Sequence, residues 1–225
     1  GIEMCAGKLV VKDGTITSTG ANKDETGSQN AILDGAAISI INRNYPGGVP
    51  TAEITGGTIK ATGTGMTVKA YDYKNDTVAL WTDVSNYVDI SGGTFSNIPS
   101  NMSALCADGY EAKENADGTW TVQAKVYAAE YNGTKYETLQ TAIEAASTSY
   151  AQTVKMLRDV ELSETINVYK QSPGALTLDL GGHTLTGKGC RAIWLHKNYM
   201  TITNGTVTSE GNSDASSVIR VGSDE

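Results

Sequence analysis

Hydrophobic and polar positions alternate in a nine-residue pattern that occurs five times, at residues 9–17, 52–60, 88–96, 178–186 and 200–208. Each copy has two apolar residues two positions apart, then a pair of turn formers, a threonine and an apolar anchor. Alternation with a period of two is typical of a half-buried strand. Turn pairs rich in Gly, Asn and Asp favour positive φ, so we expect it in the Gly56-Gly57 and Gly92-Gly93 pairs. Each copy predicts a strand, a tight corner and a second strand.

Strands this short do not form an independently stable hairpin, so they must pair with strands elsewhere in the chain. Their recurrence indicates coils that stack on one another, with equivalent positions of the repeat in neighbouring ladders. Inward positions such as Ile54, Ile59, Ile90 and Phe95 would form the core, while Glu53 faces outward. The pattern therefore predicts an all-β fold and, within that class, a right-handed parallel β-helix. Short apolar runs at 37–41, 78–81 and 218–221 predict further strands of the coils.

The pattern is interrupted between residues 99 and 152, which divides the chain into two parts. A β-hairpin is predicted from strands at 110–113 and 119–122 around the turn Asp117-Gly118, and a further strand at 126–131. A helix is predicted at 138–146, with Thr138 as its N-cap and Leu139, Ala142 and Ile143 on its apolar face. A helix ahead of a first coil would cover its open core and backbone edge. We therefore expect a boundary between residues 124 and 125.

Several segments resemble a known type of repeat. These are EYNGTKYETLQTAIEAA, TVKMLRDVELSETINV, LTLDLGGHTLTG, and ISGGTFS followed by ADGYEAKENADGTWTV. They are similar to the right-handed β-helix repeat modules of large secreted or wall-anchored proteins of gut Firmicutes and their relatives. The resemblance implies that the TLQTAIEAA helix opens one β-helix and that the GGTFS segment with its hairpin closes another. Residues 1–124 would then be the C-terminal part of one module, and residues 125–225 the capping strand, helix and first coils of the next.

Composition narrows the range of partners. The chain of 225 residues has 17 Lys and Arg against 25 Asp and Glu, a formal net charge of −8. Because no basic stripe is present to meet phosphates, we expect no nucleic-acid partner. No apolar run approaches the roughly 20 residues that cross a bilayer, so direct membrane insertion is not expected. Cys5, Cys106 and Cys190 lack metal-site or CxxC spacing and are expected to be buried as small apolar side chains.

The sequence predicts no catalytic residue, no metal site and no cofactor. Its acidic residues are scattered, and neither of its two histidines, His183 in a corner and His196 on a strand, has a nearby nucleophile at a suggestive spacing. Trp194 lies between the inward positions Ile193 and Leu195, so it should face outward near His196 and Tyr199. Exposed aromatic side chains on a flat sheet suit stacking on sugars. Trp194, His196 and Tyr199 are therefore the predicted binding residues, unless a loop or a neighbouring module covers them.

We expect an extracellular or cell-surface module of a bacterial protein that acts as a rigid scaffold and binds a glycan or host glycoprotein. The alternatives are a carbohydrate-active enzyme, such as a polysaccharide lyase or a glycoside hydrolase, and a purely structural repeat. The outermost strands, from Gly1 to Met4 and from Ser217 to Val221, would carry open edges. These edges predict end-to-end association with another copy of the chain.

Overall fold

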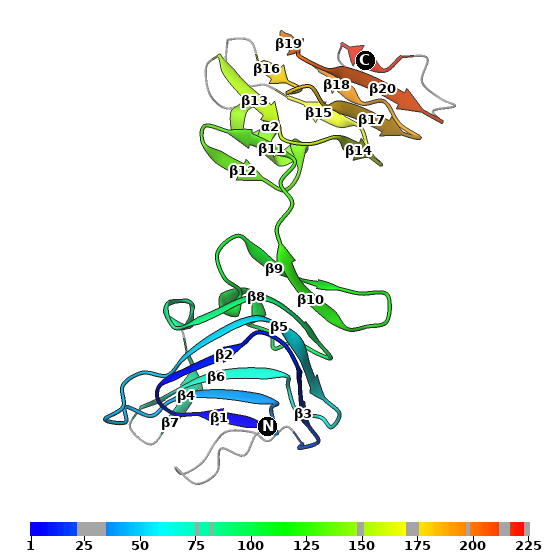
Figure 1. Cartoon of the computed structure of the whole chain (residues 1–225). Helices are drawn as coiled ribbons and strands as arrows, with labels where there is room; N and C mark the ends of the chain where they lie inside the picture. The colour runs from blue at the N-terminus through cyan, green and yellow to red at the C-terminus, as the bar shows by residue number, and fades with distance from the viewer. Residues whose placement is uncertain are drawn as a thin grey trace. The chain divides into compact units, whose positions relative to one another are not determined.

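The chain forms two compact units, Gly1–Lys125 and Val126–Glu225 (Figure 1). The structure, a computed structural model, describes residues 1–21, 35–74, 77–81, 83–147, 151–169, 176–196, 199–211 and 217–222. Of the residues that the structure describes, strands contain 50% and two helices 9%, so the protein belongs to the all-β class. The division between the units lies next to the boundary expected from the sequence.

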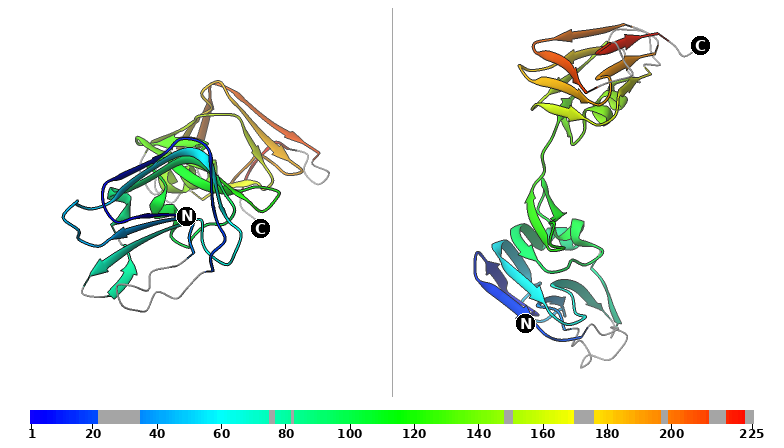
Figure 2. Two further views of the ribbon diagram at one scale, coloured as in Figure 1. Left: turned by 60° about the horizontal axis from the view of Figure 1, so that its bottom comes forward. Right: turned by 90° about the vertical axis from the view of Figure 1, so that its right-hand side faces the viewer.

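The first sheet of unit 1 begins with parallel strands. Its spatial order is β1 (Ile2–Met4), β4 (Ile38–Asn42), β6 (Val68–Lys74) and β7 (Thr77–Leu80). Ile2, Ile38 and Val68 are paired in register, and β1, β4 and β6 lie side by side in both views of Figure 2. Strand β7 instead runs antiparallel to β6. The run at 78–81 was predicted to be another strand of the coils; because β6 ends at Lys74 and β7 begins at Thr77, the chain has room for a reversal only.

The second sheet of unit 1 carries the first three copies of the repeat. It contains β2 (Lys8–Val11), β5 (Thr51–Ala61), β8 (Val88–Phe95), β10 (Trp120–Ala124) and β9 (Tyr110–Glu114) in spatial order, with β3 (Thr15–Ser18) also beside β5. Equivalent repeat positions are paired: Ile54 with Ile90, and Ile59 with Phe95. These four side chains are fully buried, which confirms the predicted inward positions.

The two glycines of each Gly-Gly corner meet two different requirements. Gly57 and Gly93 have φ of +87° and +100°, as predicted, a conformation that residues with a Cβ adopt only with strain. Gly92 has no such φ, but a Cβ built on it would lie 2.2 Å from the carbonyl oxygen of Thr55 on the neighbouring strand. The first glycine of the pair in β8 therefore allows neighbouring strands to approach closely, and the second, in each pair, allows a turn in the backbone between two stretches of strand that both pair in parallel.

Short elements close the end of unit 1. These are a 3-10 helix, η1 (Val84–Asn86), the helix α1 (Met102–Leu105), and the antiparallel hairpin of β9 and β10. Cys106 forms a parallel bridge with Ile90, and Trp120 of β10 pairs with Phe95 of β8. The hairpin was predicted from the sequence. Helix α1 was not, because one turn is too short to produce a helical apolar period.

Within its described residues, unit 2 has three sheets. The first contains β12 (Thr134–Tyr136), β11 (Ala129–Tyr131), β13 (Gln152–Met156), β16 (Leu176–Asp179) and β19 (Met200–Thr203). The second contains β14 (Val160–Leu162), β17 (Thr184–Lys188) and β20 (Thr206–Glu210), and the third contains β15 (Ile166–Val168), β18 (Ile193–Leu195) and β21 (Ile219–Val221). The described pairs among strands β13 to β21 are parallel, and from β13 the chain visits each sheet once before it returns to the first.

One register in unit 2 differs from the sequence repeat. The repeat makes Leu178 equivalent to Met200, but Leu178 pairs with Ile202, whereas the anchors Leu185 and Val207 pair as expected. The difference arises at the corner after β16, where four residues separate Asp179 from Thr184, against two between their partners Thr203 and Thr206.

Helix α2 (Leu139–Ser147) packs against β11, β13 and β15. As predicted, Thr138 caps it: the backbone N–H of Thr141 donates to the Thr138 hydroxyl over 3.2 Å. Leu139, Ala142, Ile143 and Ala146 are buried. Each unit has its own apolar core. Within the described ranges, neither helix has the length and apolar character needed to cross a membrane.

Candidate binding site

Four side chains of unit 2 form one continuous stack. The ring centroids of Tyr169 and His196 are 4.1 Å apart, and those of His196 and Trp194 are 4.3 Å apart. The interplanar angles are 20° and 21°, so the rings are nearly parallel. The guanidinium carbon of Arg220 lies 4.3 Å from the centroid of the Trp194 ring. We call Tyr169, His196, Trp194 and Arg220 the aromatic stack.

Strand register brings the members of this stack together. Asn167, Trp194 and Arg220 are paired across β15, β18 and β21. Their neighbours in β15 and β18 are buried in the core, so alternation directs these three outward. The Trp194 indole N–H donates to the carbonyl oxygen of Gly222 over 2.8 Å, and Nε2 of His196 lies 3.0 Å from Oδ1 of Asn167. These hydrogen bonds hold both rings in place.

The members of the stack differ in how much ring surface they offer to a ligand. Trp194 has His196 and Arg220 against it, and His196 lies between two rings. Tyr169 stands at the end of the stack, with one stacking partner among the described residues and 58% of its surface exposed. Tyr169 therefore offers the aromatic face best suited to a flat ligand.

A small pocket adjoins Tyr169. It has a volume of about 260 Å³ and is lined by Gln140, Ile143, Glu144, Ser147, Asn167 and Tyr169, and we call it the helix pocket. The Gln140 amide donates to Oε1 of Glu144 over 2.7 Å, and the Ser147 hydroxyl donates to the backbone carbonyl of Glu144 over 2.7 Å. A carboxylate, two amides and a hydroxyl thus border the pocket beside an aromatic ring.

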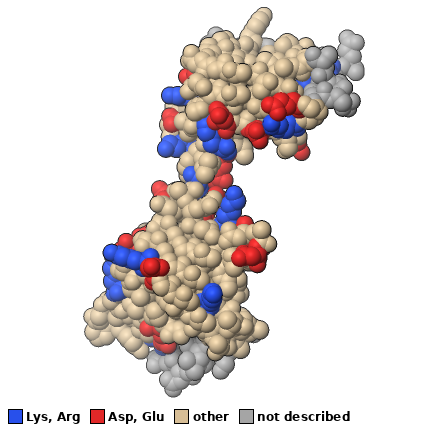
Figure 3. Space-filling view, turned by 45° about the vertical axis from the view of Figure 1, so that its right-hand side comes forward, with Lys and Arg blue, Asp and Glu red and all other residues tan. Residues whose placement is uncertain are grey.

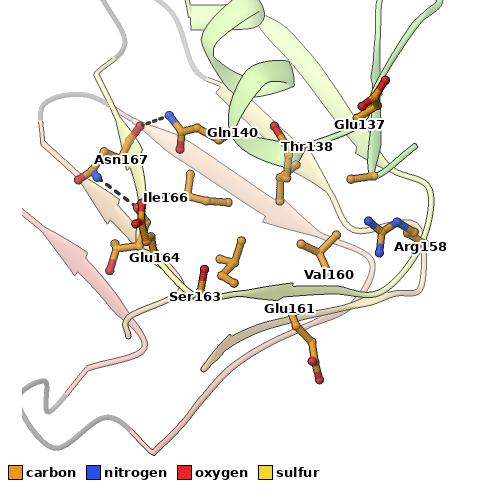
Figure 4. A pocket seen from close by; sticks show the side chains of 14 residues that line it. Glu137, Thr138, Gln140, Arg158, Val160, Glu161, Ser163, Glu164, Ile166 and Asn167 are labelled. Carbon is orange, nitrogen blue, oxygen red and sulfur yellow. Dashed lines mark hydrogen bonds between the residues drawn. The ribbon is translucent and has the colours of Figure 1, made fainter. Parts of the chain in front are cut away.

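A second pocket, of about 430 Å³, lies between the start of α2 and the strands β14 and β15 (Figure 4). We call it the first-coil pocket. Val160, Ile166 and Leu139 give it an apolar floor, and its rim includes Glu137, Ser163 and Arg158. Gln140 lines both pockets, and its amide donates to the backbone carbonyl of Asn167 over 3.3 Å. Figure 4 also shows the Glu161 side chain pointing away from the cavity.

The sequence-predicted binding residues are only partly brought together. Trp194 and His196 are stacked on each other. Tyr199 is 83% exposed and takes part in no ring contact within the described chain. Tyr169 and Arg220 were missed. Each lies in or directly after a strand of the sheet that carries Trp194, but the register between coils is needed to place them there.

The outer face of the second sheet of unit 2 carries alternating charges. Nζ of Lys188 lies 3.5 Å from Oε1 of Glu161 and 2.5 Å from Oε2 of Glu210. The hydrogen bond to Glu210, with the nearby charge of Glu161, raises the pKa of Lys188. We call Glu161, Lys188 and Glu210 the charge ladder. Elsewhere on the face shown in Figure 3, basic and acidic side chains are interspersed.

Other titratable groups have structural surroundings. The hydrogen bond from the Asn204 amide, with one from the backbone N–H of Gly181, lowers the pKa of Asp179 and fixes the corner after β16. Nδ1 of His183 lies 3.4 Å from Oδ1 of Asp159, which also accepts the backbone N–H of Thr184. This oxygen therefore links the segment before β14 to the corner after β16.

The three cysteines are all unpaired as disulfides. Cys106 is buried, and Cys5 and Cys190 are half-buried, in partial agreement with the predicted burial. Burial raises the pKa of both Cys5 and Cys106, so these thiols are protonated at neutral pH and poor nucleophiles. Within the described ranges, no three His, Cys, Asp or Glu side chains gather in a group that could hold a metal ion.

Comparison of the chain with protein-family models, with curated proteins and with solved structures found no match.

Proposed function

We propose that both units are right-handed parallel β-helices. In unit 2, the succession β13-β14-β15 is followed by β16-β17-β18 and then β19-β20-β21, and each strand pairs in parallel with its counterpart in the next set. In unit 1, three repeats pair in the same way. Connections between parallel strands of one sheet are right-handed in about 98% of cases, which supports this hand. Each coil would rise by the strand spacing of about 4.8 Å.

The proposed role is that of an extracellular or cell-surface module of a bacterial protein, which serves as a rigid scaffold and binds a glycan or a glycoprotein. The segments similar to β-helix repeat modules of secreted and wall-anchored proteins support the location. The observation that carries the binding role is the aromatic stack beside the helix pocket.

The chemistry of a sugar fits this arrangement. A pyranose ring has a face of C–H groups that stacks on an aromatic ring, while its edge carries hydroxyls that donate and accept hydrogen bonds. In the proposed complex the sugar lies on Tyr169, and Glu144 and Gln140 contact its hydroxyls. Because Glu144 already holds Gln140 by a hydrogen bond, the polar groups are ordered before a ligand arrives.

A glycan array followed by calorimetry on the best oligosaccharide tests this role. Tyr169→Ala should weaken binding about tenfold, corresponding to about 1.4 kcal/mol, because it removes the exposed ring. Tyr199→Ala is the matched control: its ring is more exposed but outside the stack, so affinity should be unchanged. A blank array together with a blank mucin pulldown would contradict the proposal, as would equal affinities of the two variants. Release of unsaturated product from uronic-acid polysaccharides would instead indicate a lyase.

End-to-end association stays part of the proposal. Strand β1 pairs with β4, and β21 with β18, so within the described residues each has one paired edge. Val221 is 72% exposed. Light scattering over a dilution series should show a concentration-dependent dimer. A monomer at all concentrations would contradict this part of the proposal.

A further inference from the structure

Strands β13, β14 and β15 are the first strands of the parallel pairings in the three sheets of unit 2. Two of them contact another element on the side away from the strand that follows in the sheet. Strand β13 pairs antiparallel with β11. Strand β15 receives a hydrogen bond from Gln140 of α2 at the carbonyl oxygen of Asn167. Strand β14 pairs with β17, and within the described residues no strand pairs with its other edge. Such an edge presents backbone N–H and C=O groups that can pair with an added strand.

The first-coil pocket adjoins this edge. Val160 and Leu162 of β14 line it, together with Ile166 and Leu139 from the neighbouring elements, and Figure 4 shows Val160 and Ile166 directed into the cavity. The alternation along β14 places Glu161 on the opposite face. A strand added beside β14 would alternate in the same way, with every second side chain directed toward the pocket.

Unit 1 contains an example of the geometry that such a strand would adopt. Its last repeat strand, β8, is covered by the antiparallel strand β10, in which Trp120 pairs with Phe95. Val122 of β10 is 3% exposed and belongs to the core. The part of β8 that carries the repeat anchor Phe95 is thus covered by an extended segment with an inward apolar side chain. Strand β14 occupies the equivalent position in unit 2, because its Val160 pairs with the repeat anchor Leu185.

The charge ladder indicates which charge a side chain on a strand added beside β14 should carry. Along the outer face, Glu210 of β20 contacts Lys188 of β17, and Lys188 contacts Glu161 of β14. The ladder therefore ends in a negative charge at the edge strand. Opposite charges on adjacent strands stabilise their pairing, whereas like charges destabilise it. A side chain on the added strand that continues this alternation of charges is basic. The residues that line the pocket favour the same charge, because they include Glu137 and Glu164 against one basic residue, Arg158.

We propose that the edge of β14 binds an extended peptide from another polypeptide by β-strand addition. Two apolar side chains of the peptide face the first-coil pocket, and a lysine or arginine between them faces Glu161. Backbone hydrogen bonds supply most of the affinity, and the alternating side chains give the specificity. This site shares Gln140 and Asn167 with the helix pocket, but it uses the edge of β14 and does not depend on glycan binding.

Fluorescence anisotropy of the whole chain with labelled peptides tests the proposal. A peptide with the core Thr-Val-Lys-Val-Thr should bind about twofold to fivefold more tightly than one with Thr-Val-Glu-Val-Thr. N-methylation of single backbone amides should weaken binding on the order of tenfold at alternate positions only, because only every second N–H faces the partner strand. Loss at alternate positions is the signature of strand addition, since N-methylation leaves the side chains unchanged.

Glu161→Lys tests the role of charge. This variant should reverse the preference and bind the acidic peptide more tightly, while Glu114→Lys, at an exposed position in unit 1, should keep the preference of the natural chain. Circular dichroism checks that both variants fold. The proposal is overturned if no peptide binds up to about 1 mM, a binding free energy of about −4.1 kcal/mol. Equal binding of all N-methylated peptides, or an unchanged preference in Glu161→Lys, would also overturn it.

Discussion

Strand β8 leaves no room for a side chain at Gly92, whose φ lies outside the left-handed region. A Cβ on Gly92 would lie 2.2 Å from the oxygen and 2.8 Å from the carbon of the Thr55 carbonyl. Both atoms belong to the backbone of β5, so no side-chain rotation can relieve the contact. Gly92→Ala therefore tests crowding between coils without the strain of a positive φ.

Gly92→Ala should lower the free energy of unfolding of unit 1. To accommodate the methyl group, β8 must move away from β5 at a place where their pairing is already irregular. Overpacking of this kind typically costs about 1–3 kcal/mol. For a unit of this size, each kcal/mol lowers the melting temperature by about 4 °C, so unit 1 should melt about 4–12 °C lower. Unit 2 has its own core and should be unaffected.

Thermal unfolding, with hydrogen exchange resolved by segment, measures this effect for each unit separately. Gly118→Asn is the matched control, because Gly118 has φ of +79° but open space around it, and asparagine tolerates that conformation. The control should change the melting temperature of unit 1 by no more than about 2 °C. If Gly92→Ala melts together with the natural chain, the close stacking of β5 and β8 is wrong.

Three further predictions concern the core, the corners and the thiols. Ile90→Asp should unfold unit 1, because it leaves an unpaired charge in a dry core. Circular dichroism should show Glu53→Ala folded, with little change in melting temperature, because its ion pair with Lys8 is exposed. Because the pKa of Asp179 is lowered in the folded state, its contribution to the free energy of unfolding is present above about pH 4 and is lost as pH falls through the lowered pKa. The melting temperature of Asp179→Asn should therefore fall less on acidification than that of the natural chain. Cys106 should react with a thiol reagent at the rate at which unit 1 opens, measured by absorbance; immediate reaction would contradict its burial.

The sequence was sufficient to predict the features that depend on local pattern. Alternation placed Ile54, Ile90 and Phe95 in the core, and the Gly-Gly pairs supplied the positive φ at Gly57 and Gly93. These predictions succeeded because a period of two and a glycine corner are decided by neighbouring residues. The cap at Thr138 was predictable for the same reason.

Features that depend on register were not predictable. The aromatic stack needs Tyr169 and His196 beside each other, although they follow different strands, β15 and β18, and are 27 positions apart in the sequence. A corner with two extra residues shifts the pairing register of the strand beside it by two positions without changing which side chains face inward. The pairing of Leu178 with Ile202 is an example. Tyr199 was therefore placed in the binding group by its nearness in sequence, while Tyr169 was omitted.

This separation between alternation and register explains how one repeat can carry different surfaces. The inward positions must stay apolar to fill the core, so they leave little freedom for binding. The outward positions are almost free, and pairing brings residues of successive coils into contact, as in the aromatic stack and the charge ladder. A loop that changes the register by two residues preserves the core but gives each outward side chain a new neighbour. The number of residues between consecutive strands, rather than the repeat itself, therefore decides which outward residues meet to form a binding surface.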